Sequence, residues 1–232
     1  ADVERWMAGA RKLVEDTPSE RPPWIQFNIP ITGKQTPICN ADSALHILEQ
    51  HPLFQTAIWF DKFRNHILTT WNTPHPHEWQ EWDTQRLLVF LQREIRLSKM
   101  NKQAVEDALG VFVSTRTKHE VQDWLTTLTW DQTPRIETCL TTLFGAADTP
   151  YVRAASRNFW LSLIARIQRP GCQMDHMIIL EGPQNLGKTK ALRIFGGAWY
   201  LSMTESVMDK DFFQALQGKI LVELAEMESF KG

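Results

Sequence analysis

Cysteine is scarce in this sequence, and its three cysteines lie far apart. Cys39, Cys139 and Cys172 show no paired spacing, which argues against a disulfide framework, a redox dithiol and a cysteine-rich zinc site. Long apolar runs are missing too, because no stretch approaches the roughly 18 apolar residues of a membrane helix. The arginines near the start lie among acidic residues instead of preceding an apolar signal core. We therefore expect reduced thiols, no membrane partner and a cytoplasmic location.

An excess of either charge is also absent. Lysine and arginine together number 25, aspartate and glutamate 27, and the formal net charge is -2. Composition therefore does not point to nucleic acid, and any DNA contact would need a local patch. Ten tryptophans are many for 232 residues. Tryptophans between cations can stack on bases, but packing in cores and hinges is the interpretation that we favour.

The first 36 residues are rich in proline and contain one possible strand at Trp24 to Ile29. This stretch, residues 1–36, is typical of an arm or linker. A helix capped by Asp42 or Ser43 opens a compact domain over residues 37–128. A hairpin with its turn at Lys62 to Asn65 follows, and then helices that begin at Asp83, Asn101 and Glu120. We expect a mainly helical, winged-helix-like accessory domain.

A second domain is expected over residues 129–232. The pattern predicts a long helix from Tyr151 to Gln168, stopped by Pro170 and Gly171. His176 to Leu180 then forms an apolar run that reads as a buried strand. The stretch after it carries the chemistry.

The loop after this run fits the Walker A pattern, in which two glycines five residues apart precede Lys and Thr. The glycines permit a tight backbone path that turns amides and a helix N-terminus toward phosphates. Lys188 is expected against the β and γ phosphates of ATP, and the Thr189 hydroxyl on Mg²⁺. The predicted nucleotide-binding residues are Gly182, Pro183, Gln184, Asn185, Leu186, Gly187, Lys188 and Thr189.

A second motif, which carries acidic residues, follows about thirty residues after the loop. The apolar run Ile220 to Val222 ends at Glu223, at the carboxyl end of a predicted strand, where ligands of open α/β sheets bind. We assign Glu223 as the Walker B acid that holds Mg²⁺ through water and Glu226 as the residue that orients or deprotonates the attacking water. Lys188, Glu223 and Glu226 are the candidate catalytic residues. The alternative is two solvated carboxylates at a helix start.

From about Asn40 onward the chain resembles the virulence-associated protein E family, P-loop ATPases of phages and genomic islands. These are related to superfamily III helicases and to primase-helicases. Several ordered blocks carry the resemblance in addition to the Walker motifs: Trp130–Arg135, Asp148–Tyr151, Arg169–Cys172, Asp175–Met177 and Leu216–Lys219.

The resemblance implies an α/β P-loop fold of AAA+ type behind the helical domain. It also implies a hexameric ring of identical subunits in a bacterial host cell. Such a ring binds single-stranded or forked DNA and couples ATP hydrolysis to strand separation. Function by analogy is an associational argument, separate from the phosphate chemistry of the loop. The leading hypothesis is thus a phage or mobile-element replicative helicase or initiator ATPase.

The chain departs from the family pattern in two respects. Leu224 and Ala225 separate the two acids, which are adjacent in most AAA+ proteins. The sequence also stops six residues after Glu226, before the regions of sensor 1 and an arginine finger, and shows no primase domain upstream. We expect an AAA+ domain that is incomplete at its C-terminus, binds nucleotide weakly and lacks helicase-like turnover.

Other functions compete with this one. A nucleotide-gated assembly switch or defence ATPase would bind ATP without moving along DNA. A small-molecule kinase is disfavoured because no arginine-rich lid follows the Walker A helix. Four arginines of the long helix and its end could contact DNA or a neighbouring subunit's nucleotide, or be ordinary solvated charge: Arg153, Arg157, Arg166 and Arg169.

Overall fold

The computed structural model describes residues 22–203 and 210–225, and these fall into two compact units. The first unit takes the described residues of 1–60 and 67–117. The second takes those of 61–66 and 118–232. The division at 117/118 differs from the predicted one at 128/129, because the helix that follows residue 118 is counted with the second unit.

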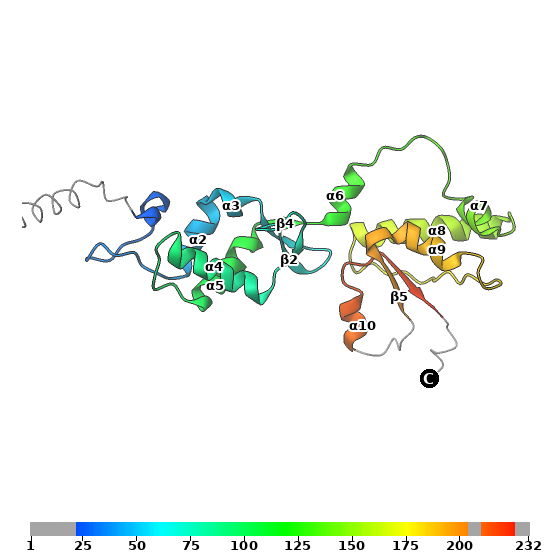
Figure 1. The fold of residues 1–232 in the computed structure, drawn as a ribbon. Coiled ribbons are helices and arrows are strands. Elements are labelled where there is room, and N and C mark those ends of the chain that lie inside the picture. Colours follow the sequence, from blue (N-terminus) through cyan, green and yellow to red (C-terminus); the bar gives the residue numbers. More distant parts are fainter. Residues whose placement is uncertain (1–21, 204–209, 226–232) are drawn as a thin grey trace, which may run out of the picture. The chain divides into compact units, whose positions relative to one another are not determined.

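The first unit contains three main helices and most of a small sheet (Figure 1). The sheet has the strand order β3-β2-β1-β4, and Leu68 and Glu78 are partners in the antiparallel β2–β3 pair. The elements in chain order are η1 (Pro23–Phe27), α2 (Ala41–Gln50), α3 (Pro52–Gln55), β1 (Ile58–Asp61), β2 (His66–Thr69), β3 (His77–Glu78), α4 (Glu81–Arg93), α5 (Lys102–Ser114) and β4 (Thr117–Lys118).

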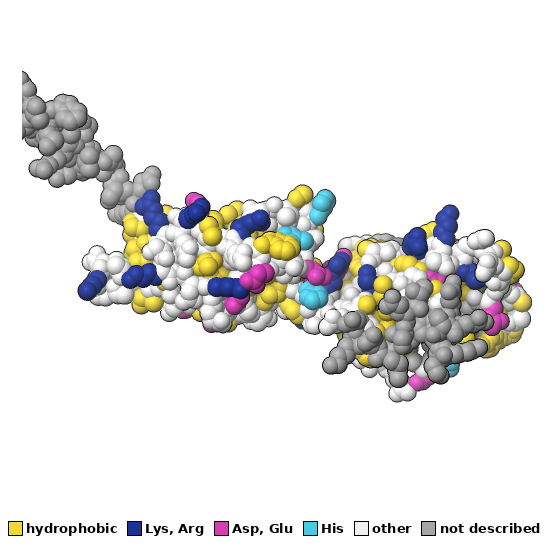
Figure 2. Space-filling model, turned by 60° about the horizontal axis from the view of Figure 1, so that its bottom comes forward, with side chains coloured by type: hydrophobic (Ala, Val, Ile, Leu, Met, Phe, Trp, Pro, Cys, Tyr) yellow, Lys and Arg dark blue, Asp and Glu magenta, His cyan; other side chains and the backbone are white. Residues whose placement is uncertain are grey.

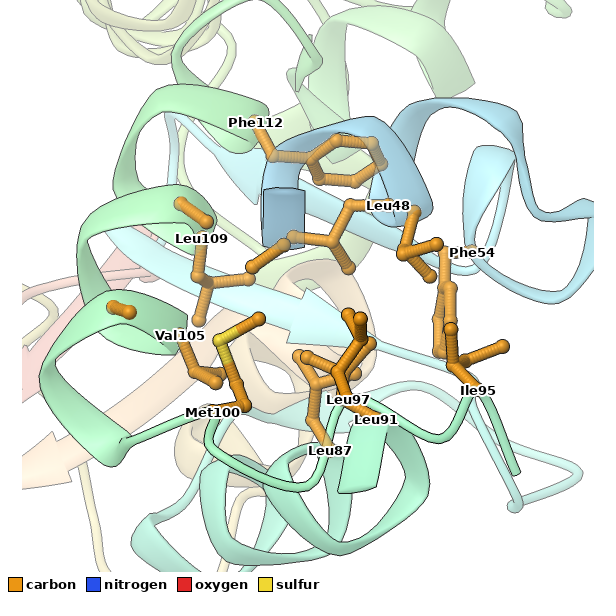
Figure 3. Close-up of a cluster of buried hydrophobic side chains, with 14 of the residues drawn as sticks. Leu48, Phe54, Leu87, Leu91, Ile95, Leu97, Met100, Val105, Leu109 and Phe112 are labelled. Atoms are coloured by element: carbon orange, nitrogen blue, oxygen red, sulfur yellow. The ribbon is translucent and has the colours of Figure 1, made fainter. Parts of the chain in front are cut away.

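The core of the first unit lies where α2 and α4 pack on α5. Leu48, Leu87 and Phe112 are completely buried there (Figure 3). The Phe54 ring meets the Trp71 ring edge-on, with 5.2 Å between centroids, an arrangement that aromatic pairs prefer. Burial of this many large apolar side chains supplies the main driving force for folding.

The hairpin and the helices expected in this region are present, but three local details of the prediction were wrong. Residues 23–27 form a 3-10 helix instead of a strand, because Pro23 fits the first helical position. The cap of α2 is Asn40, whose side chain accepts from the Ser43 amide. Asp83 lies in the first turn of α4 and accepts from the Gln80 amide in a capping box. Asn101 caps α5 as predicted.

The described part of the second unit contains helices and a parallel strand pair, β5 and β6. α6 and α7 pack on the long helix α8, and α9 packs on both strands. α8 begins after Thr149, which caps it. The elements are α6 (Glu120–Thr126), α7 (Cys139–Phe144), α8 (Pro150–Gln168), α9 (Lys188–Gly196), η2 (Gly197–Trp199), β5 (Tyr200–Met203), α10 (Lys210–Ala215) and β6 (Leu221–Leu224).

The strand expected at residues 176–180 is not formed. These residues are extended but make no ladder, and Met177 and Ile179 are 61% and 59% exposed. A strand needs a neighbour for its backbone groups, and no described residue bonds to this backbone. The assignment of the first domain as winged-helix-like and of the second as AAA+ type stays a prediction.

Candidate functional site

The loop before α9 carries the predicted phosphate-binding sequence on an exposed stretch of the second unit. Its last residue, Gly187, takes the N-cap position of α9 with a φ of 84°. Only glycine adopts this left-handed conformation without strain. Nothing lies within 4 Å of a Cβ built at Gly187, so backbone conformation and not space selects glycine here. The helix therefore begins at Lys188, and the amides of its first turn have no acceptor within the helix, which is the feature that binds phosphates at helix N-termini.

Lys188 folds back over this loop. Its Nζ donates to the carbonyl oxygen of Gly182 at 2.7 Å and to that of Pro183 at 3.0 Å. These are replaceable bonds, because the carbonyls are exposed and the ammonium group can swing to a stronger acceptor such as a phosphate oxygen. The side chain is thus held at the mouth of the loop with its charge available.

Glu223 meets the first turn of α9. The Thr189 hydroxyl donates to its Oε1 at 2.7 Å across 34 residues of sequence. Glu223 lies on β6, which runs parallel to β5, and α9 packs on both strands. The structure therefore brings together the hydroxyl and the carboxylate that the sequence assigned to Mg²⁺.

Tyr200, which the sequence analysis did not identify, completes this group. Its hydroxyl donates to Oε2 of Glu223. Burial and this bond to the carboxylate raise the pKa of Tyr200. A short strand at residues 200–203, after the Gly196-Gly197 break, is the sequence signal that could have drawn attention to it. The place of this strand beside β6 depends on a contact between residues that are distant in sequence.

A cavity of about 960 Å³ lies beside the loop. One wall is formed by loop residues and Glu223, and another by apolar side chains of α7, α8 and α9, among them Leu140, Trp160 and Phe195. Pockets that bind small molecules and cofactors combine a few polar groups with an apolar lining in this way, at roughly 300–1,000 Å³. The site thus has a polar end at the loop and an apolar body.

No cluster of three or more His, Cys, Asp or Glu side chains suited to a metal occurs among the described residues. A site built from Thr189 and Glu223 needs further oxygen ligands, and Mg²⁺ commonly takes these from phosphates and water. The donor set therefore fits a magnesium ion that arrives with a nucleotide. Glu226, the proposed water-orienting acid, lies outside the described residues.

The four arginines of α8 and its end are mostly engaged locally. Arg153 pairs with Asp148 through two bonds of 2.7 Å, and Arg157 lies 3.6 Å from Glu137. Arg166 donates to a backbone carbonyl at 3.0 Å. Such contacts account for three of the four without a ligand.

Comparison with known proteins finds a family model that matches part of the chain. Residues 125–232 match the model of the virulence-associated protein E-like domain. The match begins within α6 and spans the loop, α9 and β6. No curated protein matches the chain. None of the helices in the described ranges is long and apolar enough to cross a membrane.

Proposed function

We propose that this chain is the ATP-binding portion of a phage or mobile-element replicative DNA helicase or initiator ATPase, because residues 125–232 match the model of the virulence-associated protein E-like domain. The observation that carries the nucleotide part is the meeting of Thr189 and Glu223, 2.7 Å apart, one residue from Lys188. A phosphate loop, a cation, a hydroxyl and an acid are the parts that P-loop enzymes use.

The residues would share the work as follows. The loop amides up to Gly187 and the N-terminus of α9 receive the phosphates, and Lys188 exchanges its two carbonyl acceptors for phosphate oxygens. Thr189, and Glu223 through water, would hold Mg²⁺, which would neutralise charge on the phosphates when bound. The two side chains already touch, so the site needs no recruitment of distant groups.

The DNA part of the proposal rests on the family and not on charge. On the face that Figure 2 presents, lysine and arginine side chains are scattered and do not gather into one patch. Contacts with single-stranded or forked DNA, and assembly into a homo-oligomeric ring, are therefore proposed by analogy with the family.

Binding of ATP with Mg²⁺ by calorimetry tests the nucleotide part. Lys188→Ala should weaken binding by roughly 10- to 100-fold, since it removes hydrogen bonds from a charged group. Lys99→Ala, which removes an exposed lysine of the first unit, is the matched control. Equal affinity for the wild type and the Lys188 variant, with both folded by circular dichroism, would refute the P-loop assignment.

Strand separation is a distinct test. ATP-dependent unwinding of a forked duplex by the oligomer would support the helicase. ATP binding and assembly with no unwinding would instead favour a nucleotide-gated switch or defence ATPase. Salt dependence of DNA affinity, with log affinity falling as log salt rises, would establish phosphate contacts.

A further inference from the structure

We propose that Tyr200 is a positioning residue that fixes the carboxylate of Glu223 for metal binding. This inference rests on the proposed function, because it assigns a role within the same magnesium site. Its basis is that each oxygen of Glu223 accepts a different hydroxyl: Oε1 from Thr189 at 2.7 Å and Oε2 from Tyr200.

Strand register places the tyrosine within reach. In the parallel pair, Tyr200 is the partner of Leu221 and Ser202 that of Glu223. Residues two apart on a strand lie on the same face, so Tyr200 is the diagonal neighbour of Glu223. Diagonal neighbours are close enough for long aromatic side chains to span. The hydroxyl therefore approaches the carboxylate along the sheet, and Thr189 approaches from α9.

A glycine at the end of α9 lets the helix pack closely on the strands beside Tyr200. Gly196 is buried, and a Cβ added to it would lie only 2.6 Å from Cβ of Tyr200 and 3.3 Å from Cβ of Leu221. Any larger residue would push the helix off the strands. The close approach of helix and strand thus fixes the base of the tyrosine side chain.

The two hydroxyls have different roles. Thr189 is itself a proposed metal ligand, so it is not a support of Glu223 that is independent of the ion. Tyr200 lies on the neighbouring strand and is not part of the proposed ligand set, so its bond to Oε2 would hold the carboxylate in place with or without Mg²⁺. Hydrogen bonds to ligating carboxylates orient them and support metal affinity.

Paired affinity measurements test this role. ATP affinity is measured in EDTA and across a Mg²⁺ titration for wild type, Tyr200→Phe and Tyr151→Phe. Tyr151 is the other tyrosine of the chain and is 80% exposed. Tyr200→Phe should raise the Mg²⁺ concentration for half-maximal enhancement by about 10- to 100-fold. Affinity in EDTA should not change, and Tyr151→Phe should resemble wild type.

A double-mutant cycle with Glu223→Gln separates positioning from packing. If Tyr200 acts through the carboxylate, Tyr200→Phe should have no further effect on Mg²⁺ dependence in the Glu223→Gln background. An equal effect in both backgrounds, a loss of affinity in EDTA, or Mg²⁺ dependence like that of Tyr151→Phe would each overturn the inference. Wild type that binds no ATP would instead refute the proposed function, and this inference with it.

Discussion

The two units of this chain bury apolar side chains to different extents. In the first, helices α2, α4 and α5 enclose a continuous cluster that includes Ile47, Leu91 and Val105, each fully buried. In the described part of the second, the buried apolar residues are few: Val121, Cys139, Leu140, Ile167 and Leu221. The candidate site lies in the second unit, beside a cavity and not beside a packed core.

The unit with the larger apolar core is thus not the unit that holds the candidate site. A core closed by its own helices needs no ligand to be stable. The second unit keeps large apolar side chains exposed, among them Leu186 in the loop and Ile194 on α9 at 69% and 70%. Loosely packed regions are where binding segments can open. We expect nucleotide or further protein contacts to stabilise the second unit more than the first.

The largest expected effect comes from a change in the first core. Phe54→Ala removes a fully buried ring that packs on Trp71 and Phe90, and should cost the first unit about 3–5 kcal/mol of unfolding free energy. Urea unfolding followed by circular dichroism measures it.

Leu192→Ala is the comparison in the second unit. Leu192 is half-buried and lines the cavity, so fewer packing contacts are lost and the cost should be smaller. A loss for Leu192→Ala equal to or greater than that for Phe54→Ala would contradict the difference between the units.

A smaller effect is expected where the second unit is tightly packed. Gly196→Ala places a methyl group 2.6 Å from Cβ of Tyr200, and forcing helix α9 and strand β5 apart should cost roughly 1–3 kcal/mol. Gly110→Ala, on helix α5 with nothing within 4 Å of the added Cβ, is the control and should be neutral or slightly stabilising. Thermal unfolding of both variants measures the difference in stability between them.

Local pattern in the sequence was enough to select Lys188, Thr189 and Glu223. The structure brings Thr189 and Glu223 into contact, and the roles assigned to all three stay predictions. Sequence reasoning failed at 176–180, because apolar character predicts burial but a strand also needs a pairing partner. It missed Tyr200, because the bond to Glu223 depends on the register of two strands that are distant in sequence.

Limited proteolysis should cut first in the segment of the second unit that follows α6. Residues 127–138 contain no helix or strand, and Trp130 within them is 70% exposed. Exposed backbone with few hydrogen bonds is the preferred substrate of proteases. We expect the first cuts between 127 and 138, identified by mass spectrometry. Earlier cuts inside α4 or α5 would show that the first unit is the less stable one.

The smallest expected effect concerns Arg153, whose guanidinium group pairs with Asp148 through two bonds of 2.7 Å on the surface. This bond holds the pKa of Asp148 below its usual range. A carboxyl whose pKa is lowered by folding contributes stability above its unfolded pKa of about 4 and loses it as the pH falls through the folded value. Arg153→Gln should therefore bring the pKa of Asp148 back toward 4, as measured by NMR titration of the carboxyl carbon. Because solvent screens an exposed pair, the unfolding midpoint at pH 7 should not change measurably. A clear drop in that midpoint at pH 7 that vanishes at pH 2 would show that the second unit depends on surface ion pairs where its apolar packing is sparse.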